Sequence, residues 1–448
     1  MTNLAKVANN ASLNMLRYIL LIFVSLITSI ILARQLGTDG LGAYAVVLSM
    51  VTLSVSMTNT GTGNSITYYV SRNQQSLKDV VQHVFGLSIV VATVATSIAI
   101  ITLFFKDILY NAIPLGLLIS GITMIPVIIL TNNFASIFVG QEKFFHNNVL
   151  QLATQLGTLV LTVVLVGIVP LGTYGGVISV GLGNLCGLIA AIGLILYQTE
   201  VKYLCPTFDW DYIRDVMTYG LKVQLGFIAI ILNYRIDVFI LNILTNTTYV
   251  GIYTQAVQIG EQMWLLSRAV ASAMMPRIAA LEGFDDERSH ITSIISRYVL
   301  WLNLAISIVL FFISEPAIVL LYGAEFRASG TTLKFLLPGL VMAGTSRIIG
   351  SDIGGRGRPE INGIHALIAA IINIILNFIL IPSYGFIGSA IATTISYTVL
   401  YILKLFAFRH LTGTSICKMI FLYRDDLLRI YRAMRMIYRS IAKRQKAE

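Results

Sequence analysis

Twelve apolar runs of membrane-spanning length follow one another along this chain of 448 residues, separated by short polar breaks. A helix that crosses a bilayer needs about 20 apolar residues, so the pattern predicts an all-α polytopic membrane protein. The composition agrees, because 56% of the residues are apolar and only 12% are charged, which excludes a soluble enzyme or a disordered chain. The first run is longer than the core of a signal peptide, and we expect it to be retained as a helix. The runs are residues 12–33, 41–65, 80–104, 112–138, 148–169, 174–197, 219–244, 250–276, 293–314, 331–350, 361–381 and 386–408.

The basic residues are distributed unequally between the two sets of breaks. Of the 31 Lys and Arg residues, 24 are assigned to the side that holds both termini, including several at the ends of runs, and Lys222, Arg235 and Arg268 are assigned to the interior of runs. Cytoplasmic loops carry an excess of Lys and Arg, so both termini are predicted to be cytoplasmic, in a multi-pass protein of the cytoplasmic membrane. The other side holds only Arg34, Lys106, Arg327 and Lys334.

Two short motifs recur at nearly the same offset. Residues 42–44 (Gly-Ala-Tyr) open the second run and residues 251–253 (Gly-Ile-Tyr) open the eighth, an offset of 209; Tyr174-Gly175 and Tyr384-Gly385 are related by 210. An offset of six runs predicts two repeats of the same topology, which form two lobes. We therefore expect six-helix lobes over residues 1–200 and 219–408, with a cytoplasmic linker over residues 201–218.

The C-terminal tail, residues 409–448, supplies +7 of the net charge of +10. Its apolar residues recur at helical spacing with basic residues between them, which predicts an amphipathic helix on the anionic cytoplasmic leaflet rather than a nucleic-acid-binding segment. The apolar positions are Ile416, Ile420, Tyr423, Leu427, Ile430, Met434, Ile437 and Ile441.

Charged residues inside the runs are the first candidates for a functional site. Glu261 and Arg268 belong to a polar stripe on the eighth run, together with Thr254, Gln258 and Ser272. Arg235, in the seventh run, is predicted to lie roughly 15 Å deep, as is Glu261, so the two are expected to pair between helices. Such residues line a cavity or, alternatively, only hold helices together by an ion pair.

Polar faces on the fifth and eleventh runs provide further candidates. Gln151 and Gln155 lie on one face of the fifth run, and Asn373 and Asn377 on one face of the eleventh. They either contact a sugar or hydrogen-bond between helices. Candidate ion-coupling residues are Asp237, Glu261 and His365.

Other motifs are less informative. The three cysteines, Cys186, Cys205 and Cys417, have no spacing typical of a disulfide framework or a metal site. Residues 58–65, which are rich in Thr, Asn and Gly, predict a bent or locally unwound helix.

Several sequence blocks resemble the Wzx-type polysaccharide flippases of the MATE/MurJ/Wzx (MOP) transporter superfamily, over nearly all of residues 5–408. No single block is decisive, but their order across twelve runs is specific. They are residues 32–37 (LARQLG) with 42–44, residues 61–72 (GTGNSITYYVSR), residues 237–241 (DVFIL) with 250–253 and 275–277, and residues 357–359 (GRP) with 373–377 and 381–385.

The resemblance implies a V-shaped pair of lobes around a basic cavity, and transport of an undecaprenyl-diphosphate-linked oligosaccharide from the inner to the outer leaflet. It implies no catalytic motif and no cofactor, and a polysaccharide polymerase is an expected partner. Because Arg can grip phosphate oxygens with two parallel hydrogen bonds, Arg268 and Arg17 are the candidate clamp for the diphosphate.

Two other functions remain open. A MATE-type exporter of cationic drugs would share the lobes, but acidic residues would be expected to dominate its cavity, and Arg235 and Arg268 offset Asp237 and Glu261 here. A membrane glycosyltransferase or polysaccharide polymerase would be expected to carry carboxylates or arginines on a large outer loop. The longest predicted outer loop, residues 315–330, holds only Glu315, Glu325 and Arg327.

Overall fold

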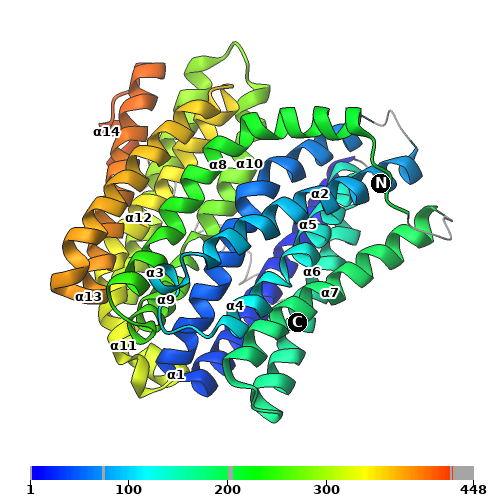
Figure 1. Cartoon of the computed structure of the whole chain (residues 1–448). Coiled ribbons are helices and arrows are strands. Elements are labelled where there is room, and N and C mark those ends of the chain that lie inside the picture. The colour runs from blue at the N-terminus through cyan, green and yellow to red at the C-terminus, as the bar shows by residue number, and fades with distance from the viewer. Residues whose placement is uncertain (1–2, 73–75, 200–204, 424–425, 427–448) are drawn as a thin grey trace, which may run out of the picture.

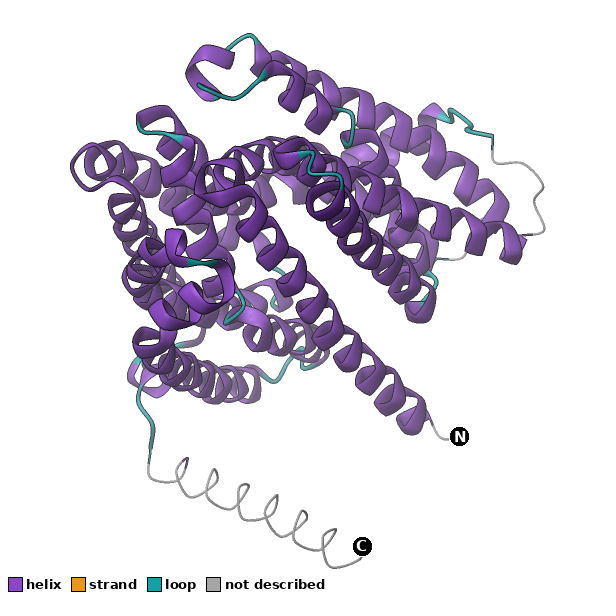
Figure 2. Ribbon diagram, turned by 90° about the horizontal axis from the view of Figure 1, so that it is seen from below, coloured by secondary structure: helices purple, strands orange, loops and turns teal. Residues whose placement is uncertain are grey.

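The computed structural model describes residues 3–72, 76–199, 205–423 and 426. Within these residues the chain forms helices and no strands, as expected (Figure 2). The N-terminal half contains α1 (Asn3–Ser71), α2 (Leu77–Leu103), α3 (Lys106–Leu109), α4 (Leu115–Ile122), α5 (Ile125–Gly140), α6 (Phe144–Thr162), the π-helix η1 (Val163–Ile168) and α7 (Gly172–Thr199). The C-terminal half contains α8 (Trp210–Leu244), α9 (Thr247–Glu261), α10 (Trp264–Ala280), α11 (Asp285–Tyr322), the 3-10 helix η2 (Ala324–Phe326), α12 (Arg327–Gly355), α13 (Pro359–Thr412) and α14 (Cys417–Ile420).

Nine helical segments in the described part of the chain are long and apolar enough to cross a membrane. Two of the helices, α1 and α13, each carry two of the twelve predicted runs, because each bends at a glycine with positive φ: Gly37 at 64° and Gly385 at 56°. The eighth run corresponds to α9 and α10, which at 15 and 17 residues are each too short to be counted among the nine. The chain is therefore a polytopic all-α protein, as the sequence predicts.

Two helix ends that were predicted to lie on the outer side of the membrane lie close together in the structure. The bend at Gly37 approaches Glu325, and Arg34 donates to the carbonyls of Leu320 and Leu321 at 2.7 and 2.8 Å, so the first bend and the end of α11 share one face. This end, at the bottom of Figure 1, is the predicted outer face, and α14 lies at the opposite end. We refer to these as the outer and cytoplasmic ends.

Helix packing is dense within each half of the chain. In the N-terminal half α5 packs on α1 and α2 and α6 packs on α7; in the C-terminal half α12 packs on α11 and α13 and α8 packs on α13. The part of α1 that follows the bend at Gly37 joins the halves by packing on α8 and α9.

The structure gives the conformation of two segments that the sequence singled out. The residues from 210 to 218 of the predicted linker are helical, because Asp209 caps α8 by accepting from the backbone N–H groups of Asp211 and Tyr212 at 3.0 and 3.1 Å. Residues 58–65 are not unwound, because α1 is helical there and hydroxyls such as that of Thr62 bond back to the carbonyl four residues earlier.

The start of the tail is also different from the prediction. After Gly413, which has a φ of 67°, only α14 is helical before residue 424, and Met419 is fully buried against α12 and α13. Arg297 of α11 donates to the Lys418 carbonyl at 3.0 Å and to the buried Asp426 carboxylate at 2.6 Å. The first part of the tail therefore docks on the protein instead of forming a surface helix; residues 427–448 lie outside the described part.

Candidate functional site

An ion pair links α8 and α9 within the membrane-spanning region. Arg235 Nη2 lies 3.5 Å from Glu261 Oε2, and the two side chains are 35% and 20% exposed. This confirms the pairing that was predicted from equal depth. Neither side chain is fully buried, so the pair is less completely desolvated than an ion pair in a protein core.

The eighth run is broken directly after Glu261. α9 ends there, residues 262 and 263 form a turn, and α10 starts at Trp264. Arg268 Nη2 donates to the Glu261 carbonyl at 3.1 Å, across the break. Since the last carbonyls of a helix lack partners within the helix, the Arg268 guanidinium caps α9 as well as presenting a positive charge.

The side chains around this break form one polar face. We use "polar face" for the partly or fully exposed residues Gln258, Glu261, Gln262, Arg268 and Ser272. The predicted straight stripe is therefore divided between two half-helices. The backbone is not unwound at the break, because Gln262 and Met263 keep right-handed helical φ and ψ angles and their N–H groups donate to the Ile259 and Gly260 carbonyls at 3.2 and 3.1 Å.

A second polar cluster lies buried inside the C-terminal half, around Asp237. Asp237 is 2% exposed and accepts hydrogen bonds from the Tyr253 hydroxyl, from Thr393 Oγ1 at 3.4 Å and from the Val238 N–H at 2.8 Å. Tyr253 Oη and Thr393 Oγ1 are themselves 3.0 Å apart. The cluster combines one carboxylate with neutral oxygens from α8, α9 and α13.

Asn373 and Asn377 belong to this cluster and not to an exposed surface. Both are fully buried; Asn373 Nδ2 donates to Thr393 Oγ1 at 3.4 Å, and Asn377 Nδ2 donates to Asn373 Oδ1 at 3.0 Å. Asn377 Oδ1 has no hydrogen-bond partner among the described residues. In this arrangement a sugar could not reach either side chain, and the amide N–H of Asn373 instead joins the pair to Thr393 of the Asp237 cluster.

The remaining sequence candidates are dispersed. Gln151 and Gln155 lie half-buried on α6, where Gln151 contacts Asn147 at 3.5 Å. His365 is half-buried on α13, two turns before Asn373, and its Nδ1 has no partner in the described chain. Arg17 belongs to α1, but its side chain lies outside the described part.

Two cations inside the C-terminal half were counted in the sequence only as topology signals. Arg347 stacks on Trp264, with its guanidinium carbon 4.4 Å from the ring centroid, and donates to the Tyr234 hydroxyl at 3.1 Å. Lys404 is 8% exposed and donates to the Ser346 carbonyl at 3.3 Å. Arg347 falls inside the tenth predicted run and Lys404 inside the twelfth, and this position could have identified both as buried cations.

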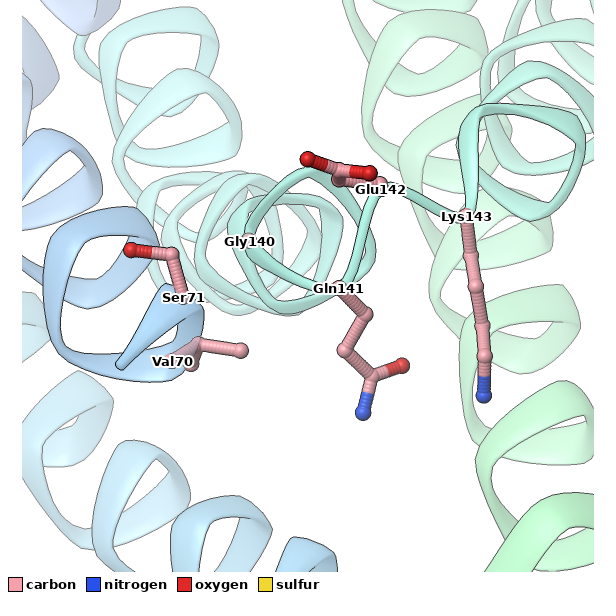
Figure 3. A pocket seen from close by; sticks show the side chains of 6 residues that line it. All are labelled: Val70, Ser71, Gly140, Gln141, Glu142 and Lys143. Atoms are coloured by element: carbon pink, nitrogen blue, oxygen red, sulfur yellow. The ribbon is translucent and has the colours of Figure 1, made fainter. Parts of the chain in front are cut away.

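A separate pocket of about 420 Å³ opens where α1 and α5 end, at the cytoplasmic end (Figure 3). Gln141 and Lys143 extend in one direction and Glu142 in the other, and Lys143 Nζ donates to Gln198 Oε1 at 2.6 Å. Because the ammonium group is already paired and the carboxylate points away, the pocket has no convergent set of polar groups. Its lining residues are Val70, Ser71, Gly140, Gln141, Glu142 and Lys143.

In the described residues, no three His, Cys, Asp or Glu side chains come together as a transition-metal site would require. The Asp237 cluster offers a different ligand set. It holds one carboxylate and the hydroxyl oxygens of Tyr253 and Thr393, which are groups that can bind a proton or a monovalent hard cation.

Comparison with known sequences gives consistent results. The model of the family described as polysaccharide biosynthesis protein matches residues 7–282. The probable low-salt glycan biosynthesis flippase Agl15 of Haloferax volcanii is 26% identical over 218 residues, which is 48% of this chain and 46% of the relative. The capsular polysaccharide biosynthesis protein CapF of Staphylococcus aureus is 25% identical over 169 residues, 37% of this chain and 42% of the relative. The chain spans about half the length of the curated relatives it matches.

The fold is similar to that of transporters of known structure. The lipid II flippase MurJ, in an inward closed conformation, superposes with a TM-score of 0.74 at 16% identity, covering 88% of this chain and 87% of that one. An inward-facing multidrug resistance MATE transporter of the MOP superfamily gives 0.73 at 16% identity, over 88% and 94% of the chains. An outward-facing MATE transporter gives 0.62 at 16% identity, over 88% and 92%.

Proposed function

The chain belongs to the polysaccharide biosynthesis protein family, and from this membership we propose that it is a flippase that moves a lipid-linked oligosaccharide from the inner to the outer leaflet of the cytoplasmic membrane. The polar face of α9 and α10 is the observation that carries the proposal. Its charged and amide side chains are exposed within a predicted span, where contact with lipid tails would be costly. An aqueous route for a hydrophilic headgroup gives these side chains a favourable environment.

The cargo we propose is an undecaprenyl-diphosphate-linked oligosaccharide. Arg268 lies exposed at the helix break, and its planar guanidinium can bind phosphate oxygens with two parallel hydrogen bonds. Gln258, Gln262 and Ser272 offer amide and hydroxyl groups for sugar hydroxyls next to it. The prenyl chain would remain in the lipid while the headgroup follows the polar face.

Alternating access between two six-helix lobes is the proposed mechanism. In this structure the outer ends of the two halves are in contact, through α1 with α9 and through Arg34 with the end of α11. The higher similarity to an inward-facing than to an outward-facing MATE transporter supports an inward-oriented state. Cargo would then enter from the cytoplasmic leaflet, and separation of the outer ends would release it.

We propose the Asp237 cluster as the site where an ion is coupled to this movement. A carboxylate that is 2% exposed is costly to keep charged, and its hydrogen-bond partners are hydroxyl and amide groups. Among the described residues, the one cation that acts on it electrostatically, Arg235, is also paired with Glu261. A proton or a monovalent cation would balance the charge. Because the ligands come from α8, α9 and α13, binding of the ion would favour one packing of these helices over another.

The membrane potential would contribute to outward transport of an anionic cargo. A diphosphate carries about two negative charges, and each is worth about 2.3 kcal/mol per 100 mV, so a cell with a negative interior supplies roughly 4–5 kcal/mol. This holds when no compensating cation moves with the cargo.

Transport in proteoliposomes tests the proposal. A fluorescent undecaprenyl-diphosphate oligosaccharide is placed in both leaflets, and an impermeant quencher reports the fraction that reaches the outside under an imposed potential. The protein should accelerate the exchange, and Arg268→Ala should abolish the acceleration. Gly193→Ala is the matched control, since a methyl group at Gly193 meets nothing within 4 Å.

The same vesicles distinguish the alternative function. A protein that ignores this lipid but extrudes a cationic dye is an exporter, and the flippase proposal then fails. A polysaccharide polymerase is the proposed functional partner, and genes for glycosyltransferases and a polymerase next to this gene would support the pathway.

A further inference from the structure

The two repeats meet at their outer ends through two glycines. A Cβ atom on Gly42 would lie 1.7 Å from the Thr247 carbonyl oxygen, and one on Gly251 would lie 1.9 Å from the Thr38 carbonyl oxygen. The same Cβ atoms would lie 2.9 Å from the Gly251 nitrogen and 3.1 Å from the Gly42 nitrogen. Two helix backbones therefore touch directly at this crossing, which only glycine allows.

The contact is reciprocal in a way that reflects the sequence repeat. The offset of 209 that relates Gly42 to Gly251 also relates Thr38 to Thr247. Each glycine thus packs on the carbonyl of the residue that corresponds to its own neighbour four positions earlier. A crossing with this property has approximate two-fold symmetry, as in an interface between two identical subunits.

Side chains reinforce the crossing. Asp39 Oδ1 accepts a hydrogen bond from the Thr247 hydroxyl and a longer one, 3.4 Å, from the Thr248 hydroxyl. Beneath the crossing, Ser29 and the fully buried Gln255 face each other at 3.5 Å. The polar groups below are thereby closed off from the outer end.

We propose that Thr38, Gly42, Thr247 and Gly251, with Asp39, form the outer seal of the transporter, and that the seal opens as one unit because its two halves are related by the repeat. The contact between the helices is observed in the structure, and only its role as a seal rests on the proposed transport function. The two glycine–carbonyl contacts lie together at the two-fold axis. Separating Gly42 from the Thr247 carbonyl therefore also separates Gly251 from the Thr38 carbonyl.

Disulfide cross-linking tests the closed contact. In a variant without Cys186, Cys205 and Cys417, which are all exposed, cysteines are placed at Asp39 and Thr247, whose side chains are hydrogen-bonded. Oxidation with copper phenanthroline should cross-link this pair and stop transport, and reduction should restore it. Asp39→Cys with Asp107→Cys is the control pair, since Asp107 is fully exposed on α3. No cross-link in the Asp39–Thr247 pair overturns the proposed closed contact.

Glycine variants test whether the seal acts as one unit. Gly42→Ala and Gly251→Ala place a methyl group more than 1 Å too close to a carbonyl, so each should lower the cross-linking yield by about fivefold or more. Labelling of a cysteine at Gln255 by an impermeant maleimide added outside should rise correspondingly. Gly193→Ala should change neither measurement.

The double variant shows whether the two glycine contacts open together. Because either methyl group already separates both contacts, Gly42→Ala with Gly251→Ala should behave like a single variant. Multiplicative effects on labelling would show two independent contacts, and parental cross-linking in either single variant would show that the glycines do not form the seal. If a variant is not produced, the oxidised and reduced Asp39–Thr247 pair with both glycines intact still decides whether closure blocks transport.

Cross-linking does not depend on the cargo. A protein that forms the cross-link but moves no lipid-linked oligosaccharide retains the seal and refutes the proposed function. A protein that moves the lipid at the parental rate while cross-linked refutes the seal and retains the function.

Discussion

Neutralising one member of the Arg235–Glu261 pair should destabilise the protein, and the magnitude follows from the structure. The charged atoms are 3.5 Å apart, and an effective dielectric constant of about 20 gives an attraction of about 5 kcal/mol before desolvation is considered. Because the arginine is 35% exposed and the pair is not fully desolvated, we expect Arg235→Gln or Glu261→Gln to cost about 2 kcal/mol, less than the loss of one partner from a fully buried pair.

A double-mutant cycle isolates the pair. Each single variant leaves one charge without its partner, whereas Arg235→Gln with Glu261→Gln leaves none, so the double variant should lose about 1–2 kcal/mol less than the sum of the singles. Thermal unfolding in detergent and transport in proteoliposomes are measured on all four proteins. Strictly additive losses in both assays would refute the coupling. Gly193→Ala, which lies outside the polar face and changes no charge, is the control.

Three further predictions concern other regions. Arg268→Ala should abolish transport while Arg268→Lys retains part of it, because lysine can still donate to the Glu261 carbonyl but cannot form the two parallel bonds to phosphate; equal rates in proteoliposomes for both variants would argue against a clamp. Although burial opposes ionisation of Asp426, the Tyr423 N–H and the Arg297 guanidinium hold its pKa below the ordinary 3.8, so its stabilising contribution is complete above that value and lost as the pH falls through the lower folded pKa. Asp426→Asn should remove that acid dependence and cost about 3 kcal/mol, measured by unfolding and by proteolysis of the tail; unchanged stability would contradict the docking. Cys205 should resist an impermeant maleimide in intact cells, while Asp107→Cys should be labelled. Asp107 is chosen because it is fully exposed at the predicted outer end, whereas Thr247 at the same end is buried. The reverse labelling would invert the orientation.

The sequence was sufficient to predict those features that depend on local physical constraints. Apolar runs report the free energy of a helix in hydrocarbon, so the helical class and the position of every run could be read directly. The Arg235–Glu261 pair was also predictable, because helices rise by a constant amount per residue and depth can be counted from each end.

The candidate site was only partly predictable, because a polar side chain in a span looks the same in sequence whether it faces water or a buried partner. For Asn373 and Asn377 the sequence left sugar contact and hydrogen bonding between helices both open, and the structure buries both, with Asn373 bonded to Thr393 and Asn377 to Asn373. The break after Glu261 has no Pro or Gly within it, so periodicity predicted a continuous stripe. The docked tail depends on Asp426 meeting Arg297, 129 residues away, which no local pattern records.

The sequence by itself determined that the chain is a polytopic helical membrane protein, and it predicted a basic cytoplasmic side and two related halves. Only the tertiary structure decided how those halves touch. The motifs at Gly42 and Gly251 indicate common descent of the two repeats, but a repeat offset contains no information about distance. Their backbones meet because the two halves pack about an approximate two-fold axis, and positions related by such an axis come into contact only where they lie on it.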